Sequence, residues 1–309
     1  MKTSIVGCGL VGRAWAISFA RGGHEVALYD ANRDAVKAAL EFIDTALEEL
    51  AGYDLLDGNT VADVRRRISV SGSLAEALDG SDHVQESTFE DLAVKKAVFA
   101  ELDSLAEAQT VLASSSSAIL PSLFTEDLTG RDRCLVVHPI NPPYLVPAVE
   151  VVPAPWTRSE ICDRVGRFLA DIGQAPIMMK REIDGFVMNR LQGALLQEAF
   201  RLVAEGYAST SDVDIGIRRG LGLRWSFLGP FETIDLNAPG GARDYAERYE
   251  GLYQKLWHSQ QHIVPWSGRV IDDIEDELSA SLPRKQLGER QLWRDRRLMA
   301  LIAHQRASE

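Results

Sequence analysis

The first thirty residues carry a pattern that few folds can accommodate. Residues 3–6 are predicted to form a buried strand, a helical pattern covers residues 10–20, and a second predicted strand at 25–30 ends in Asp30. Three glycines in the spacing G-x-G-x-x-G, namely Gly7, Gly9 and Gly12, follow the first strand and lead into the helix. The order strand, glycine turn, helix and strand predicts a parallel βαβ unit at the start of a doubly wound sheet.

Each glycine of this turn has a physical reason to be there. Gly7 permits a tight turn, Gly9 lets the backbone approach a pyrophosphate, and Gly12 lets the helix pack closely on the strand. Leu10 and Val11 stand at the start of the helix. The exposed N–H groups there and the helix dipole both attract phosphates. The turn therefore predicts a dinucleotide-binding site.

Asp30 bears on the choice of dinucleotide. In such a unit an acidic residue about twenty positions after the glycines accepts hydrogen bonds from a ribose hydroxyl. The same carboxylate would repel a 2′-phosphate, so NAD is favoured over NADP. Arg33 stands close by in the sequence and could instead attract a 2′-phosphate, which would favour NADP.

Strand-like and helical segments alternate through the first part of the chain. Further strands are predicted at residues 68–71, 82–86, 110–114, 134–138, 148–152 and 175–179. Helical patterns lie between many of them, as at 91–107 and 158–172, and residues 33–63 read as a long helical insertion. The alternation predicts an α/β fold with a Rossmann-type, doubly wound parallel sheet over residues 1–183. Residues 184–309 keep only helical spacing and predict an all-helical domain.

Composition narrows the class of protein. A net charge of −12 disfavours nucleic acid and anionic membrane surfaces as partners, because both reward clustered Lys and Arg. Three scattered cysteines without metal-ligand spacing fit a reducing compartment and predict no metal site. No stretch is long and apolar enough for a membrane span, and the start does not resemble a signal peptide. We therefore expect a cytoplasmic protein with a small-molecule substrate.

Polar side chains follow two neighbouring strands of the predicted sheet. Residues 114–117 are four serines, among them Ser115 and Ser117, and His138 ends the next strand. Both positions point to the cofactor crevice, because ligands bind beyond the carboxyl ends of the strands in open α/β sheets. Glu150 follows in the next apolar run, after a turn with several prolines.

This set suits hydride transfer from a secondary alcohol. Histidine is the usual base for the hydroxyl proton, and a carboxylate on its other nitrogen fixes the tautomer and stabilises the imidazolium. Each residue by itself has a structural alternative, since a strand-end His, a serine turn or a Glu in a strand is common. Beyond a dinucleotide turn, the three together favour catalysis.

These residues resemble the L-3-hydroxyacyl-CoA dehydrogenase family. Its pattern is a serine after a strand, then H-x-x-N-P, a glutamate and G-F-x-x-N-R, and this chain has Ser117, His138 with Asn141, Glu150 and, at 185–190, GFVMNR. The resemblance implies that His138 is the base in oxidation, that Glu150 orients it, and that Ser117 and Asn189 bind the reacting oxygen and the base.

The same resemblance implies further site residues. Asn141 would help to shape the substrate site, Glu86 matches a position near the nicotinamide, and Lys95 matches another position on the cofactor side. Ser115 is expected on the cofactor side as well. Longer stretches, such as HPINPPYLVPAVEVVP, resemble the branch that contains lambda-crystallin and L-gulonate 3-dehydrogenase. That branch implies NAD-dependent oxidation of a free L-3-hydroxy acid at C3 and a homodimer formed through the helical domain.

Two sequence features bear on the substrate. Residues 33–63 hold eight acidic and only two basic residues, which weighs against binding the phosphates of CoA. Arg224 could bind a free carboxylate, or it could pair with an internal acid such as Glu232. A 3-hydroxyacyl-CoA dehydrogenase remains the first alternative. A non-catalytic, structural NAD-binding protein is the second, and the complete set of catalytic residues argues against it.

Overall fold

The computed structural model describes residues 1–308, which divide into two compact units. The first unit comprises Met1–Val187 together with the chain from Gln291 onward, and the second is Met188–Arg290. The sequence assigns everything after residue 183 to one helical domain, whereas the last part of the chain packs with the first unit. The polypeptide therefore leaves the first unit once and returns to it.

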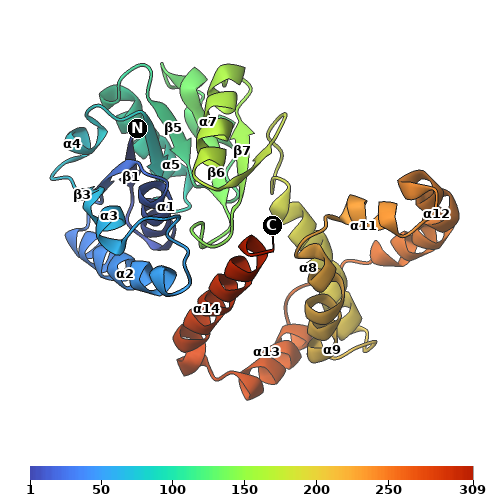
Figure 1. Ribbon diagram of the computed structural model, residues 1–309. Coiled ribbons are helices and arrows are strands. Elements are labelled where there is room, and N and C mark those ends of the chain that lie inside the picture. Colours follow the sequence, from blue (N-terminus) through green and yellow to red (C-terminus); the bar gives the residue numbers. More distant parts are fainter. Residues whose placement is uncertain (309) are drawn as a thin grey trace. The chain divides into compact units, whose positions relative to one another are not determined.

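An eight-stranded sheet forms the centre of the first unit (Figure 1), in the order β3-β2-β1-β4-β5-β6-β7-β8. The strands are β1 Lys2–Val6, β2 Glu25–Tyr29, β3 Ile68–Val70, β4 His83–Glu86, β5 Val111–Ser114, β6 Cys134–Pro139, β7 Ala148–Pro153 and β8 Ala175–Met178. Neighbouring strands are parallel except for β6 and β7. The predicted Rossmann-type, mostly parallel sheet is confirmed.

Helices connect the strands of the first unit. They are α1 Leu10–Arg21, α2 Arg33–Gly52, α3 Val61–Arg66, α4 Leu74–Leu78, α5 Leu92–Leu105, α6 Pro121–Thr125 and α7 Ser159–Asp171, with a 3-10 turn at Arg131–Arg133. Several of them begin at a polar side chain, which accepts a hydrogen bond from one of the first N–H groups. These groups have no partner within the helix itself. Asn32 accepts from the Asp34 N–H at the start of α2, and Thr60 and Asp63 form a capping box on α3. The predicted insertion at 33–63 is thus α2, a turn and the start of α3.

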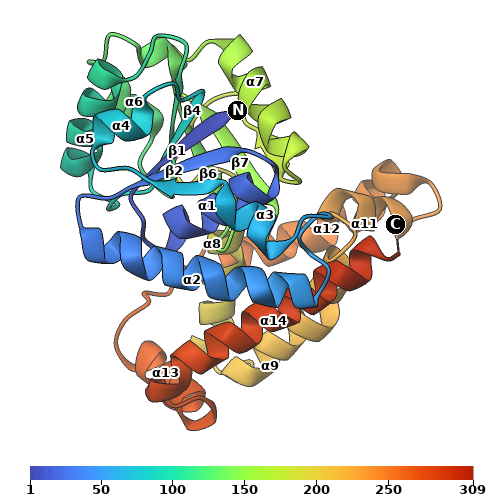
Figure 2. The ribbon, with the colours of Figure 1, turned by 60° about the vertical axis from the view of Figure 1, so that its left-hand side comes forward.

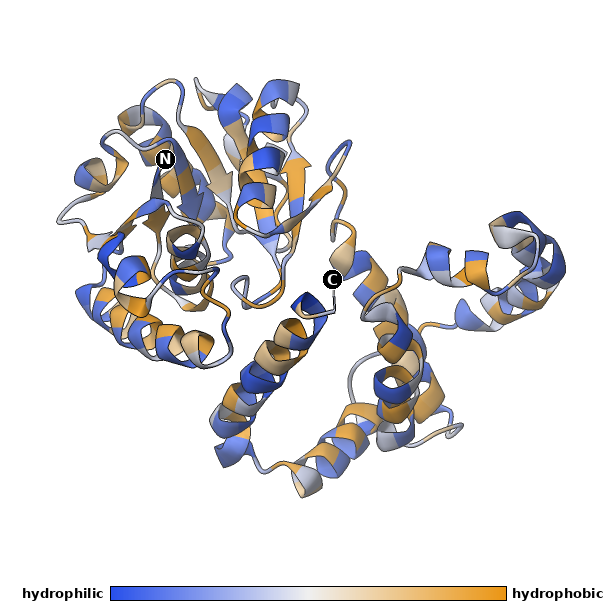
Figure 3. Cartoon of the chain, viewed as in Figure 1, coloured by the Kyte–Doolittle hydropathy of each residue, from blue (hydrophilic) through white to orange (hydrophobic). Residues whose placement is uncertain are grey.

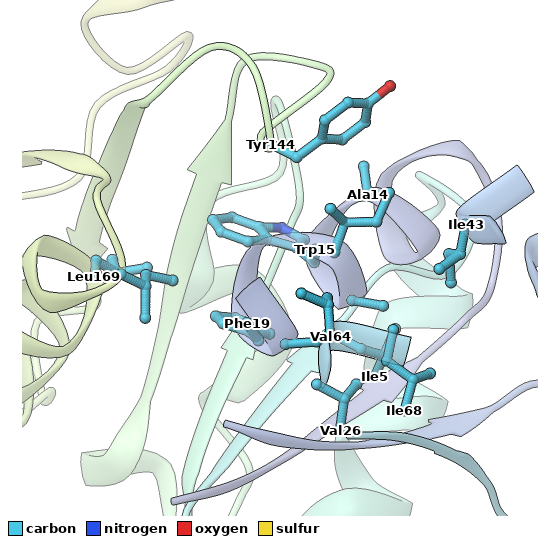
Figure 4. Packing of buried hydrophobic residues seen from close by; sticks show 14 of the residues in the cluster. Ile5, Ala14, Trp15, Phe19, Val26, Ile43, Val64, Ile68, Tyr144 and Leu169 are labelled. Carbon is cyan, nitrogen blue, oxygen red and sulfur yellow. The ribbon is translucent and has the colours of Figure 1, made fainter. Parts of the chain in front are cut away.

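Two apolar clusters pack against the sheet. Along β1, Ile5 belongs to one cluster and Val6 to the other, because successive side chains of a strand point to opposite faces. In the larger cluster the stacked rings of Trp15 and Phe19, 5.1 Å apart, join α1 to the sheet (Figure 4). Since both faces are covered, strands such as β5, β6 and β7 are apolar along most of their length (Figure 3).

The second unit is entirely helical. Its elements are α8 Met188–Ala204, α9 Thr210–Ile215, a π-helical segment at Gly216–Leu221, α10 Gly222–Trp225, α11 Pro230–Leu236, α12 Gly241–Gln260 and α13 Arg269–Ser281. A further helix, α14 Leu287–Arg306, follows a 3-10 turn at Arg284–Gln286 and lies mostly in the first unit. Ser209 caps α9, since its hydroxyl accepts from the Asp212 N–H, and Pro230 opens α11. Many large apolar side chains of this unit stay exposed, among them Phe227 at 72% and Phe231 at 81%.

Gly12 provides a test of the packing between α1 and β1. A Cβ at Gly12 would lie 1.8 Å from the Gly7 carbonyl oxygen, whereas a Cβ at Gly9 would meet nothing within 4 Å. We predict that Gly12→Ala lowers the free energy of unfolding by about 3 kcal/mol or more, because the obstacle is backbone. Gly9→Ala is the matched control and should keep wild-type stability in urea denaturation. Equal stability of the two variants would contradict this packing.

His83 makes the stability of the first unit depend on pH. It is 1% exposed, and burial lowers its pKa from 6.5 to about 4 even though Gln85 hydrogen-bonds to the ring. The neutral ring is therefore favoured in the fold, while the unfolded chain binds a proton below pH 6.5. Its contribution is present above that pH and is lost as the pH falls toward 4.

We predict that lowering the pH from 7 to 5 removes about 2 kcal/mol of stability through His83. Urea denaturation of the wild type and of His83→Gln at both pH values measures this contribution. The variant should lose correspondingly less stability between the two pH values. Identical losses in both proteins would show that His83 does not titrate in this way.

Candidate functional site

The carboxyl ends of four strands meet at one edge of the sheet. β1 ends at the glycine turn, β4 at Glu86, β5 at Ser114 and β6 at His138 and Pro139. In the ladder Val6 pairs with Glu86, and Glu86 pairs with Ser114. The edge predicted to carry the site therefore brings most of the predicted residues of the first unit together.

The glycine turn leaves the start of α1 accessible. Gly7 has φ +97°, and a Cβ there would lie 2.6 Å from the Ser87 carbonyl oxygen. Gly9 is exposed, and no side chain caps the helix there. Leu10 is 62% exposed, and Val11 beside it is half-buried. An uncapped helix start without a side chain at its tip fits the pyrophosphate of a dinucleotide.

Asp30 lies beside this turn and fits an unphosphorylated ribose. Its carboxylate accepts from the Cys8 N–H at 2.8 Å and from the Asn32 N–H at 2.8 Å. Two oxygens with about four lone pairs can still accept ribose hydroxyls. The Arg33 guanidinium donates to the Gly72 carbonyl at 2.8 Å and to that of Ser71 at 3.4 Å. The Arg33 guanidinium is therefore already engaged with backbone.

Glu86, the last residue of β4, forms a buried ion pair with Lys95 of α5. The Lys95 ammonium lies 2.8 and 2.9 Å from the two carboxylate oxygens, and both side chains are at most 1% exposed. The carboxylate also accepts from the Ser114 hydroxyl at 2.6 Å and from the N–H and hydroxyl of Thr88. Such a pair is stable in the interior only when every polar atom has a partner, as here. It joins β4, β5 and α5.

Glu90 holds the serine loop after β5. One of its oxygens accepts from the Ser116 hydroxyl at 2.7 Å and from the N–H groups of Ser117 and Ala118, both at 3.0 Å. Burial alone would raise the pKa of Glu90, but these hydrogen bonds and the charge of Lys95 lower it. The carboxylate stays ionised and fixes the backbone at Ser117.

Ser115 belongs to a polar chain that runs under the same edge. Its hydroxyl accepts from the Gln85 amide at 2.8 Å and lies 2.9 Å from the Ser87 hydroxyl. The Gln85 amide also donates to the Val137 carbonyl at 3.2 Å, and its oxygen contacts His83. The chain therefore links the serine loop to β6 immediately before His138.

His138 and Glu150 face each other across the antiparallel strands β6 and β7. They are direct partners in the ladder, and Nδ1 of the ring lies 2.7 Å from Oε2 of the carboxylate. His138 is 7% exposed and Glu150 fully buried. Among residues 1–308, no hydrogen bond to the second ring nitrogen, Nε2, is present. An imidazole held by a carboxylate at one nitrogen and open at the other can exchange a proton with a ligand.

Backbone and a side chain after β8 also contact this pair. The Val187 N–H donates to Oε1 of Glu150 at 2.6 Å, and the Phe186 ring lies 5.6 Å from the His138 ring. Phe186 is buried with φ 50°, a conformation that a bulky residue adopts rarely and that often marks a functional position. The preceding residue, Gly185, also has a positive φ, of 76°.

The remaining predicted residues lie on other elements. Asn141 is exposed in the loop between β6 and β7. Asn189 stands in the first turn of α8, in the second unit, and Arg224 is exposed on α10 of that unit. In the part of the chain that the structure describes, Arg224 has no ion-pair partner, so the suggested pairing with Glu232 is not formed.

Three participants were not predicted from the sequence. Glu90 could have been suspected only as an acid before a helix, and nothing in the sequence connects it to the serine loop. The Val187 N–H and the conformation of Phe186 are backbone features without a residue signature. Among residues 1–308, no cluster of His, Cys, Asp or Glu could hold a metal ion. Every helix of these residues is too short or too polar to span a bilayer.

Comparison with known proteins identifies the family. The model of the 3-hydroxyacyl-CoA dehydrogenase NAD-binding domain matches residues 2–183, and that of the C-terminal domain matches residues 185–265. Rabbit (Oryctolagus cuniculus) lambda-crystallin is 42% identical over 300 residues, which cover 96% of this chain and 94% of the relative. L-carnitine dehydrogenase from a Pseudomonas species is 32% identical over 298 residues, covering 96% and 91%.

Solved structures agree on the fold. The structure of a 5-formyl-3-hydroxy-2-methylpyridine 4-carboxylic acid 5-dehydrogenase superposes with a TM-score of 0.83 and 24% identity over 98% of each chain. Like its relatives, this protein is an NAD-dependent dehydrogenase that acts on CH–OH groups. The matches cover most of both units, and this chain belongs to the 3-hydroxyacyl-CoA dehydrogenase family.

Proposed function

We propose that this chain oxidises the 3-hydroxyl of a free L-3-hydroxy acid, of the L-gulonate type, to the 3-keto acid. The contact between His138 and Glu150, 2.7 Å long and buried at the carboxyl edge of the sheet, carries the proposal. It supplies a base whose second nitrogen, Nε2, makes no hydrogen bond among the described residues.

In this mechanism His138 takes the hydroxyl proton at Nε2. A bound NAD would supply the acceptor for the hydride that leaves the carbon bearing this hydroxyl. Glu150 accepts the Nδ1–H bond, which fixes the tautomer with Nε2 unprotonated and stabilises the imidazolium that forms. The Val187 N–H holds the other oxygen of Glu150, so the carboxylate cannot rotate away from the ring. In the reverse reaction His138 returns the proton.

Ser117 and Asn189 are proposed to hold the reacting oxygen and the base. The support for Ser117 is its loop, which Glu90 fixes through two backbone N–H groups, including that of Ser117 itself. Asn189 follows two residues after Val187, whose N–H already bonds Glu150. Asn141 belongs to the loop that joins His138 to Glu150 and is proposed to contact the substrate.

Cofactor roles follow the same reasoning. Gly7, Gly9 and Gly12, with Leu10 and Val11, are proposed to cradle the pyrophosphate, and Asp30 the adenosine ribose. Ser115 is proposed to face the nicotinamide side. Glu86 and Lys95 are buried in their own pair. We therefore propose that they shape the nicotinamide side of the site indirectly, through Thr88 and Ser114, which donate hydrogen bonds to Glu86.

Charge supports a free acid over a CoA ester. Some of the acidic residues of 33–63 form ion pairs, as Asp44 does with Arg65 and Glu49 with Arg296. Arg33 is held by backbone carbonyls, which leaves Lys37 as the basic residue that α2 can offer to phosphates. Arg224, exposed and without an ion-pair partner in residues 1–308, is proposed to bind the substrate carboxylate.

The main alternative keeps the chemistry and changes the substrate. The family models describe 3-hydroxyacyl-CoA dehydrogenases, which favours a CoA ester. The L-carnitine dehydrogenase match favours a free hydroxy acid by its printed name. A structural protein without turnover is the remaining alternative, and a fully assembled His138 and Glu150 pair argues against it, because folding alone does not require it.

Assembly and location complete the proposal. We propose a homodimer formed through the second unit, because its exposed Phe227, Phe231 and Trp257 would be covered by another copy. A cytoplasmic location is proposed from the reduced cysteines, since Cys8, Cys134 and Cys162 form no disulfide.

One assay distinguishes these readings. NADH formation is followed with purified protein, NAD and, in turn, L-gulonate, L-3-hydroxybutyrate, L-carnitine and 3-hydroxybutyryl-CoA. We expect turnover of a free acid, and a loss of about 10²–10⁴-fold in kcat for His138→Gln, which removes the base. Preference for the CoA ester would favour the alternative substrate. Wild-type kcat in His138→Gln would refute the proposed role of His138.

A further inference from the structure

We propose that residues 291–306 of α14, here called the terminal segment, position the loop between His138 and Glu150 by packing on Tyr144. The inference rests on the proposed function, because it assigns this segment a part in the reaction of that pair. The terminal segment lies outside both matched family domains, which end at residues 183 and 265.

The terminal segment is part of the first unit. Met299 is 1% exposed inside the larger core cluster, and Ile302 and Ala303 pack against the same cluster. The helix α14 runs beside α2 (Figure 2), and Arg296 pairs with Glu49 on α2 at 2.6 Å. Arg306 pairs with Asp57, which follows α2, at 2.6 Å. Exposed ion pairs contribute little each, so the burial of Met299 is the main source of this packing.

Tyr144, in the loop, belongs to the same core cluster as Met299 of the segment. It is 4% exposed, and its ring lies edge-on to Phe42 of α2 at 6.2 Å. A hollow of about 310 Å³ beside it is bounded by Phe42, Asp295 and Met299. Burial and the nearby Asp295 raise the pKa of Tyr144, so its hydroxyl stays neutral.

A second hollow shows that the segment flanks the loop on another side. It measures about 210 Å³ and is bounded by Pro143 and Tyr144 of the loop and by Ile302 and Arg306 of the segment. The loop backbone is held from the same direction. The Tyr144 carbonyl accepts from Arg21 at 3.1 Å, and the Pro143 carbonyl accepts from Gln174 at 3.0 Å.

The loop is short and stiff, so a shift at Tyr144 reaches its ends. Residues 140–147 join β6 to β7, and the N–H groups of Leu145 and Val146 both bond the Pro142 carbonyl, at 3.0 and 2.9 Å. His138 stands just before this loop and Glu150 just after it. A displacement of about 1 Å in a catalytic group can cost on the order of 10² in rate, so support of the loop is support of the reaction.

Three variants test the proposal. Met299→Ala removes the buried contact, and the double variant Arg296→Gln with Arg306→Gln removes the ion pairs with little risk to folding. Leu102→Ala is the matched control, because Leu102 is fully buried in the other core cluster, which contains no residue of the terminal segment. Hydrogen exchange of the peptide covering residues 139–149 and kcat with the best substrate of the panel above are measured below the unfolding temperature.

We expect Met299→Ala to speed exchange in this peptide and to lower kcat about tenfold, with NAD affinity unchanged, and the double variant to act in the same direction. Leu102→Ala should lower stability without either effect. Unchanged exchange in both test variants would overturn the proposal, as would faster exchange with unchanged kcat. A fully active His138→Gln would instead refute the proposed function, and any kcat loss in Met299→Ala would then not act through His138.

Discussion

The hydrogen bond between Nδ1 of His138 and Oε2 of Glu150 is the interaction on which the rest of the site depends. It forms because β7 runs antiparallel to β6, which places the two residues directly opposite each other only twelve positions apart in the chain. A parallel neighbour would need a crossover of a dozen or more residues and could not pair them at this separation. The single reversal in an otherwise parallel sheet therefore creates the pair.

Buried polar groups elsewhere at the same edge of the sheet also hold the site in place. The Glu86 carboxylate is surrounded by donors from Lys95, Thr88 and Ser114, and Glu90 binds the serine loop. An unpaired charge in such a place would be strongly destabilising, but a saturated one fixes the strands around it. The edge combines an open helix start at Gly9 with rigid side-chain supports, which is what a bound dinucleotide and a small substrate require.

Much of this could be predicted from the sequence. Strands at the predicted positions follow from short apolar runs between turns. The positions of His138, at the end of β6, and Ser117, in the loop after β5, follow from the rule that parallel strands end at one edge. The conformation of Phe186 and the N–H of Val187 could not be predicted, because backbone geometry leaves no residue pattern. The return of α14 to the first unit was missed for a related reason, since an amphipathic helix shows an apolar face but not its partner.

The most direct test of the account is a double-mutant cycle on His138 and Glu150. Steady-state NADH formation is measured for the wild type, His138→Gln, Glu150→Gln and the double variant, with NAD binding checked in each. If Glu150 acts only by orienting and stabilising His138, its replacement slows the wild type but leaves the rate of the His138→Gln protein unchanged. Equal losses in both backgrounds would mean that the two residues act independently, and the paired mechanism would be wrong.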